Sequence, residues 1–286
     1  MKPSAFHYEC PTDLQAALAL LASDGDTRIL AGGQSLVPMM NYRLAQPERL
    51  IDINRLSELD YIRDDGGVIA IGALARHAAI KSSDLIKEHF PIVAEAYDWI
   101  AHAAVRNRGT LCGNLCHADA ASEMPAIMQI LEADLVLSKV GTSRVIAAQD
   151  FFLGTYETAI AADEILTEVR IPKPAAGTGW GFEEVAMRRG DYAWCTVVAT
   201  LRISDGKIAA PRIAMAGVND CAARLSDAEA ALTEQTPGAF LFDAVADTVA
   251  DAATPAESNA GSAAYKRDLI RALLPRVLND AVARAT

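Results

Sequence analysis

Two glycine-bearing segments offer the clearest chemistry in this sequence. They read AGGQSL at residues 31–36 and GTLCGN at residues 109–114, and each leads into a stretch with helical features. Glycine turns leave backbone N–H groups free to surround an anionic oxygen, and the start of a helix behind the turn adds partial positive charge. The two segments therefore predict a diphosphate-binding site, with two ordinary tight turns as the open alternative.

Other catalytic signatures are missing from the chain. The nearest approach to G-x-G-x-x-G, at residues 177–181, has the wrong spacing and lies where we expect a linker. No Walker A sequence is present, and Ser35 lacks the glycine two residues later that a nucleophile elbow needs. Neither a Rossmann nucleotide site nor hydrolase chemistry is supported.

A metal site is the second possibility that the residue types raise. Cys112, Cys116, His117 and Asp119 combine thiol, imidazole and carboxylate groups, which suit zinc or iron. The two cysteines have no second pair to complete a ligand set, so buried thiols are the favoured interpretation. The five cysteines of the chain, an odd number, indicate reduced thiols in a cytoplasm rather than a disulfide framework.

The elements that position the two glycine segments follow from the spacing of apolar residues. A strand at 27–31 leads into the first segment, and a helix follows with Ser35 as its N-cap. The second segment lies in a stretch at 106–125 without periodicity, which we expect to be a long ordered loop. Around them we expect helices at 14–21, 83–90 and 92–104, and strands at 49–53, 68–72, 134–138, 144–148 and 164–171.

The segment PKPAAGTG at residues 172–179 is the best linker candidate, because it contains two prolines and two glycines. Beyond it, two apolar strands joined by Asp205-Gly206 predict a hairpin within a meander. The remainder of the chain has helical periodicity. A length of 286 residues fits two such domains.

The charge balance excludes several classes of partner. The chain has 26 Lys and Arg against 37 Asp and Glu, a formal charge of −11. An acidic surface repels nucleic acid and anionic membranes. No apolar stretch is long enough for a signal peptide or for a membrane-spanning helix, so we expect a soluble, cytoplasmic protein.

Four segments carry a resemblance to a known family. They are AGGQSLVPMMNYRLAQPERLIDI at residues 31–53, RGTLCGNLCHADAASEMPA at 108–126, DEILTEVRIP at 163–172 and RRGDYA at 188–193. In order and over nearly its whole length, the chain resembles the FAD-binding medium subunit of molybdenum hydroxylases. This is the family of aerobic carbon monoxide dehydrogenase and the xanthine dehydrogenases.

The resemblance implies an α+β fold of two domains. A FAD-binding domain of the vanillyl-alcohol-oxidase type is expected at residues 1–176, with subdomains at about 1–55 and 56–176 and FAD between them. A C-terminal flavoprotein domain is expected at residues 177–286, with a three-stranded antiparallel sheet and helices.

The resemblance also implies which residues contact FAD. Glu123 stands where the family usually has an aspartate that accepts hydrogen bonds from FAD, and Tyr192 resembles an aromatic residue close to the isoalloxazine. Leu166 lies on the strand face opposite Ile165, which contact with the flavin ring would explain. Because the AGGQS loop contains no histidine, we expect FAD to be held non-covalently. The matched positions are Ala31, Gly32, Gly33, Gln34, Ser35, Leu36, Ile100, Thr110, Gly113, Asn114, Glu123, Leu166 and Tyr192.

The function implied by the resemblance is electron transfer without a catalytic residue or a metal on this chain. A small partner subunit would carry two [2Fe-2S] clusters and a large one the molybdopterin, in an assembly of three different subunits each present twice. FAD on this chain would pass electrons to an external acceptor. A stand-alone flavin oxidoreductase and a flavin-free scaffold subunit are the alternatives. Departures from the family pattern are Cys112, in place of a glycine, and Glu183 and Glu184, where several relatives carry a lysine near the flavin.

Overall fold

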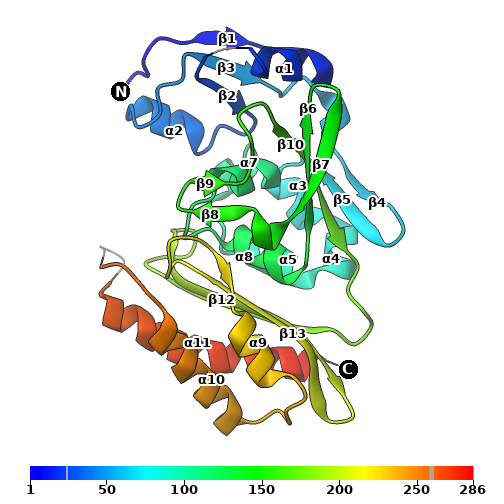
Figure 1. Cartoon of the computed structure of the whole chain (residues 1–286), viewed down its shortest axis with the longest axis vertical. Helices are drawn as coiled ribbons and strands as arrows, with labels where there is room; N and C mark the ends of the chain where they lie inside the picture. Colours follow the sequence, from blue (N-terminus) through cyan, green and yellow to red (C-terminus); the bar gives the residue numbers. More distant parts are fainter. Residues whose placement is uncertain (24, 258–260, 286) are drawn as a thin grey trace.

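The computed structural model describes residues 1–23, 25–257 and 261–285, arranged in three parts along the long axis of the molecule (Figure 1). The N-terminal part is a parallel sheet whose strands lie in the order β1 (His7–Glu9), β3 (Arg49–Asp52), β2 (Thr27–Leu30). Two helices accompany this sheet, α1 (Leu14–Leu21) and α2 (Leu36–Asn41). The predicted unit of strand, glycine turn and helix is confirmed, because β2 leads through residues 31–35 into α2.

The central part contains an antiparallel sheet of five strands. Helices and short segments lie around this sheet (Figure 1). The strands, in spatial order, are β4 (Ile62–Asp64), β5 (Val68–Gly72), β10 (Ile165–Pro172), β6 (Asp134–Lys139) and β7 (Thr142–Ala147). The helices are α3 (His77–Ser82), α4 (Asp84–His89), α5 (Pro91–Ala96), α6 (Ala103–Arg106), α7 (Leu111–His117) and α8 (Glu123–Ile130), with β8 (Phe152–Gly154) paired to β9 (Glu157–Thr158).

Two expectations for this part were wrong. The single helix predicted at 92–104 is divided into α5 and α6, and Ala101 between them has φ +50°, which is outside the right-handed helical region. The loop expected at 106–125 contains α7, because the Thr110 side chain accepts a hydrogen bond from the Gly113 amide at 3.1 Å and caps a helix there.

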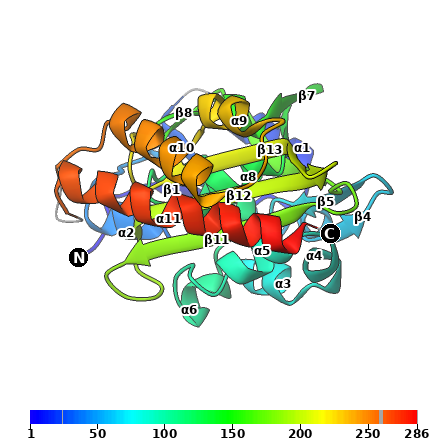
Figure 2. The same cartoon turned by 90° about the horizontal axis from the view of Figure 1, so that it is seen from below.

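The C-terminal part is an antiparallel sheet with three helices on one face (Figure 2). The three strands predicted here were an undercount, since the described residues form four. The extra strand, Ala223–Arg224, pairs with Ala214 and Met215 at the sheet edge, and two residues are too few to give a sequence alternation. The elements are β11 (Gly179–Ala186), β12 (Ala193–Ser204), β13 (Lys207–Ala216), β14 (Ala223–Arg224), α9 (Ser226–Leu232), α10 (Ala239–Ala252) and α11 (Ala263–Arg284).

The C-terminal sheet is buried on both faces. Val197 and Ala199 of β12 pack with α10 and α11, whereas Val198 belongs to the core of the central part. Helix α8 lies between that core and the sheet, and all eight of its residues are buried. The chain therefore buries a continuous apolar surface between its central and C-terminal parts.

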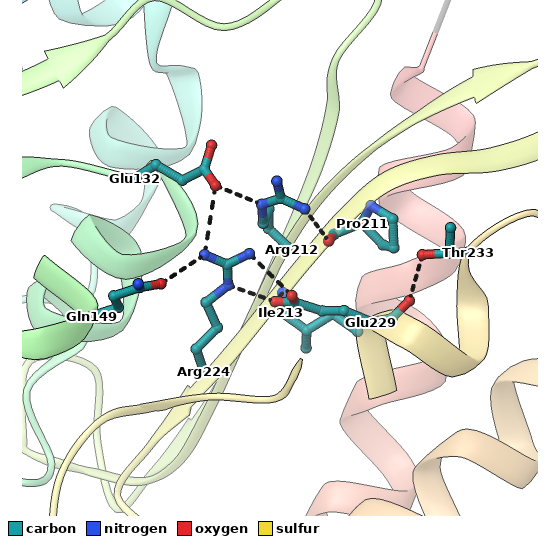
Figure 3. Close-up of polar contacts among 8 residues, drawn as sticks. All are labelled: Glu132, Gln149, Pro211, Arg212, Ile213, Arg224, Glu229 and Thr233. Atoms are coloured by element: carbon teal, nitrogen blue, oxygen red, sulfur yellow. Dashed lines mark hydrogen bonds and ion pairs between the residues drawn. The ribbon is translucent and has the colours of Figure 1, made fainter. Parts of the chain in front are cut away.

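A network of hydrogen bonds and ion pairs also joins the central and C-terminal parts (Figure 3). The Arg224 guanidinium donates two hydrogen bonds to the Glu229 carboxylate, at 2.8 and 3.0 Å. Arg212 donates to Glu132, which follows α8 in the central part, at 2.9 Å, and Arg224 lies 3.6 Å from the same carboxylate. Charges of both parts are thus paired across the junction.

No helix in the described part of the chain is both long enough and apolar enough to cross a membrane.

Candidate functional site

Residues 31–35 connect β2 to α2 and form the first loop. Gly33 has φ +70°, a left-handed conformation that favours glycine. Across the described ranges, no acceptor receives a hydrogen bond from the backbone N–H groups of residues 32–35. Ser35 precedes α2 without a hydrogen bond from its side chain to the helix, so its predicted capping role was wrong. The loop presents a run of open N–H donors, which is what a bound phosphate requires.

The first loop contacts Arg108 and Gly109, where the second glycine segment begins. A Cβ on Gly32 would meet the carbonyl oxygen of Arg108 and would lie 2.6 Å from the Cα of Gly109. Residue 32 must therefore be glycine for the two segments to approach this closely. In the second loop, a Cβ on Gly113 would lie 4.0 Å from the Ala31 Cβ. The two glycine segments, distant in the sequence, lie side by side in the structure.

Three predicted residues, Thr110, Gly113 and Asn114, form hydrogen bonds that stabilise the second glycine segment itself. The Thr110 side chain accepts from the Gly113 amide, and its carbonyl accepts from the Asn114 amide at 3.0 Å. The Asn114 side chain donates to the Ser122 hydroxyl at 2.8 Å. The amides of residues 111–112, which were not predicted as contacts, find no acceptor within the described segments. They are the open donors at the start of α7.

Asn54 and Arg76 join the two loops, and neither was identified from the sequence. Asn54 donates to the carbonyl of Ala31 at 2.8 Å and accepts from Arg76 at 2.6 Å. Arg76 also donates to the carbonyl of Arg108 at 2.7 Å. The available signal for Asn54 was its place two residues after the end of β3, since the ends of neighbouring parallel strands β2 and β3 lie at the same sheet edge.

His77 packs against Gly109, the first residue of the second glycine segment. Its backbone amide donates to the carbonyl of Gly109 at 3.0 Å, and its ring lies so close that a Cβ on Gly109 would be 2.7 Å from the ring Cδ2. The ring Nδ1 forms a hydrogen bond with the Tyr97 hydroxyl at 3.0 Å. Burial, and then the charge of Arg106, lowers the pKa of His77 to about 4, so the ring is neutral at pH 7.

A cavity of about 330 Å³ opens beside the first loop. Four predicted residues line it, together with Arg108, the residue before the second glycine segment. This volume lies at the lower end of the range typical of small-molecule sites. Its lining consists of Leu30, Ala31, Gly32, Gly33, Gln34, Val37, Pro38, Asn41, Asp52, Asn54 and Arg108.

A second cavity, of about 520 Å³, lies where the central and C-terminal parts meet, with Tyr192, Asp119 and Trp194 in its lining. The Tyr192 side chain is 57% exposed. Crowding by the protein, and then the charge of Asp119, raises the pKa of its phenol to about 12.

Glu123 is the first residue of α8 and is only 4% exposed. Burial, and then the nearby carboxyl group of Glu184 on β11, raises its pKa well above the usual range. No sequence pattern indicated that these two residues would meet.

The remaining predicted residues are apolar. Ile100 and Leu166 are 7% and 3% exposed and belong to the core of the central part, whereas Leu36 is half-buried at the start of α2. Strand β10 has a register shift between Leu166 and Glu168, so strict alternation does not describe it. Protein packing alone accounts for an apolar residue at position 166.

The residues considered as metal ligands make other contacts. Burial raises the pKa of the Cys112 thiol well above its usual range and that of Cys116 to about 12, so both thiols are protonated at pH 7. Asp119 accepts from the Tyr156 hydroxyl at 3.0 Å and lies 4.0 Å from His117 Nε2. In the ranges that the structure describes, no three His, Cys, Asp or Glu side chains are grouped to hold a metal ion.

Two family models match the chain. The model described as the FAD binding domain in molybdopterin dehydrogenase matches residues 4–174, and the CO dehydrogenase flavoprotein C-terminal domain matches residues 180–281.

Individual relatives agree with these matches. The chain is 38% identical over 287 residues to the 6-hydroxypseudooxynicotine dehydrogenase complex subunit alpha of Paenarthrobacter nicotinovorans, covering 100% of this chain and 97% of the relative. It is 38% identical over 285 residues to the carbon monoxide dehydrogenase medium chain of Hydrogenophaga pseudoflava, covering 99% of each. A solved structure of carbon monoxide dehydrogenase from the same organism, lacking the Mo-pyranopterin moiety of its cofactor, superposes with a TM-score of 0.97, 40% identity and full coverage of both chains.

Proposed function

This chain belongs to the family of FAD-binding medium subunits of molybdenum hydroxylases, and on that premise we propose how it acts as their FAD-carrying electron-transfer subunit. It is an oxidoreductase subunit with FAD as its cofactor. When bound, FAD accepts electrons from the [2Fe-2S] clusters of a partner subunit and passes them to an external acceptor. The work of this chain is to bind FAD, orient it and set its electrostatic surroundings.

The observation that carries the proposal is the contact between the two glycine segments. The amides of residues 32–35 and 111–112 are open donors, and a Cβ at Gly32 would close the space between the segments. Such a cradle fits the diphosphate of FAD, since N–H donors bind anionic oxygen without a buried cation. In this proposal Asn54 and Arg76 hold the two segments together and are positioning residues.

The other proposed contacts extend from this cradle toward the C-terminal part. Glu123 accepts hydrogen bonds from FAD, Tyr192 lies near the isoalloxazine, and Ile100 and Leu166 offer apolar contacts. The second cavity supports this arrangement, because Tyr192 lines it together with Asp119 and Ala121, which lie between α7 and α8 in the central part. Binding is non-covalent in the proposal.

The assembly and the domain boundaries belong to the same proposal. A small iron-sulfur subunit and a large molybdopterin subunit are the partners, in a heterohexamer located in the cytoplasm. A boundary between residues 176 and 177 is supported by the gap between the two family matches, at residues 174 and 180. A subdomain boundary near residue 55 is supported by the change of sheet between β3 and β4.

Purification of the tagged chain from its native host tests the function directly. We expect flavin absorption, release of FAD on denaturation, and co-purification of an iron-sulfur subunit and a molybdopterin subunit. Flavin without those two subunits would favour a stand-alone flavin oxidoreductase instead. Absence of saturable FAD binding, measured by quenching of flavin fluorescence, would favour a flavin-free scaffold.

A further inference from the structure

Lys266 is a buried cation in the first turn of α11. Only 6% of the residue is exposed, and its ammonium group donates a hydrogen bond to the carbonyl of Gly217 at 2.9 Å. The ion pairs that α11 forms within the described ranges all belong to Arg271, so Lys266 is paired with no carboxylate there. The start of a helix already carries partial positive charge, which disfavours a second cation. The ammonium group therefore has spare N–H donors and a charge without a counter-ion.

The hydrogen bond to Gly217 does not by itself explain a charge at this position. Gly217 has φ +79°, and its backbone N–H donates to the carbonyl of Ala120 at 2.7 Å, so it forms a tight turn against the central part. A neutral N–H donor would satisfy the Gly217 carbonyl as well. Burying a cation without a counter-ion costs free energy, which a neutral donor would avoid. The charge of Lys266 therefore favours a ligand with negative charge.

Lys266 lines the second cavity, and the carboxylates in the same wall have other partners. Both carboxylate oxygens of Asp119 accept hydrogen bonds, at 2.9 and 3.0 Å. Asp191 accepts from Arg188 at 3.0 Å, and Asp220 is exposed to water. The acids around the cavity therefore do not neutralise the buried ammonium group.

This cavity lies within reach of FAD bound at the glycine segments. Residues 119–121 of its lining come just after α7, and the first residues of α7 carry open donors of the diphosphate cradle. Helix α7 has seven residues and is about 10 Å long, a span that the ribityl chain of FAD can bridge. Tyr192 and Trp194 give the cavity two aromatic side chains, and its volume of about 520 Å³ is within the range of small-molecule sites. The cavity therefore suits the flat isoalloxazine ring.

We propose that the Lys266 ammonium group supplies the positive charge that stabilises the reduced isoalloxazine of FAD. The inference rests on the proposed function, in which Tyr192 lies near that ring. Full reduction takes two electrons from the iron-sulfur partner and, with one proton taken from water, leaves one net negative charge on the ring. A cation in the cavity wall binds this form more tightly than the neutral oxidised form. Lys266 thereby raises the reduction potential of bound FAD.

Two measurements on the full-length chain test this role. Fluorescence quenching gives the dissociation constant for oxidised FAD, and an anaerobic redox titration followed by flavin absorption gives the potential of bound FAD. Lys266→Gln keeps an N–H donor for the Gly217 carbonyl but has no charge. We expect its affinity for reduced FAD, relative to oxidised FAD, to fall about tenfold, which lowers the potential of this two-electron couple by about 30 mV. Its affinity for oxidised FAD should stay within about twofold of the natural protein.

Three further variants separate charge from structure. Lys266→Arg keeps the charge and should keep the natural potential, whereas Lys266→Met should lower it as Lys266→Gln does. Lys207→Gln changes the net charge equally at an exposed lysine outside the cavity lining and should have no effect. If Lys266→Met does not fold, as judged by circular dichroism, the Gln and Arg variants still decide the question.

The outcomes distinguish this inference from the proposed function. Natural FAD affinity with an unchanged potential in Lys266→Gln overturns the inference alone. An equal loss of affinity for both forms of FAD in Lys266→Gln also overturns it, because the lysine would then only hold the turn at Gly217. Absence of FAD binding by the natural protein contradicts the proposed function and, with it, the inference.

Discussion

Arg76 and Asn54 are joined by a hydrogen bond of 2.6 Å that connects the ends of two separate glycine segments. Asn54 donates to the Ala31 carbonyl in the first segment, and Arg76 donates to the carbonyl of Arg108, the residue before the second segment. The cradle for the diphosphate is therefore held by side chains that lie in neither glycine motif.

Replacing Arg76 should separate the two segments. We expect Arg76→Met to lower the free energy of unfolding by about 2 kcal/mol, because hydrogen bonds made by charged groups contribute roughly this much. FAD affinity should fall by about tenfold or more. Chemical denaturation and FAD titration measure the two effects. An unchanged FAD affinity in a folded Arg76→Met protein would contradict the bridging role.

Gly32 should tolerate no side chain. The added methyl group of Gly32→Ala meets the Arg108 carbonyl and Gly109, so the loops must move apart at a cost of about 1–3 kcal/mol in stability. We expect weaker FAD binding at the same time. Gly67→Ala is the matched control, since a Cβ there meets nothing within 4 Å. Equal FAD affinities for the two alanine variants would argue against the contact between the segments.

Acid should destabilise the protein through His77. Its pKa is near 4 in the folded protein and near 6.5 when exposed, so the unfolded chain binds more protons between these values. The stability contributed by the neutral ring is present above about pH 6.5 and is lost as the pH falls toward 4. Relative to His77→Gln, the natural protein should lose on the order of 3 kcal/mol over this range. Parallel unfolding curves for the two proteins, measured by urea denaturation at each pH, would show that His77 does not titrate in this way.

The ion network at the domain junction should contribute more to stability than surface charges do. The Arg224 side chain is 14% exposed and its partner Glu229 side chain 10%, so Arg224→Met leaves a carboxylate largely buried without its cation. We expect a loss of about 2–4 kcal/mol. Arg271→Met removes three exposed ion pairs, two that join α11 to α10 and one within α11, and should change stability by less than about 1 kcal/mol. Similar thermal midpoints for both variants would contradict this ranking.

Local features of the chain were readable from the sequence. The glycine turn between β2 and α2, the helix that buries Ala17, Leu18 and Leu21, and the hairpin at Asp205-Gly206 depend on residues within a few positions of one another. Their apolar spacing and turn residues act before any distant contact forms. Resemblance of the motifs to a family then gave the cofactor and the function.

Only the tertiary structure decided which distant residues meet. The approach of Gly32 to Arg108, the bridge from Asn54 to Arg76, and the carboxyl pair of Glu123 and Glu184 each join separate elements. The edge strand β14 exists only because β13 offers it a partner. Such contacts depend on how the sheets and α8 pack, and burial in that packing raises the pKa of Glu123 and of Glu184. The spacing of residues in the sequence determines which face of a helix or strand a side chain occupies. The packing of the whole chain determines which distant residue that side chain contacts.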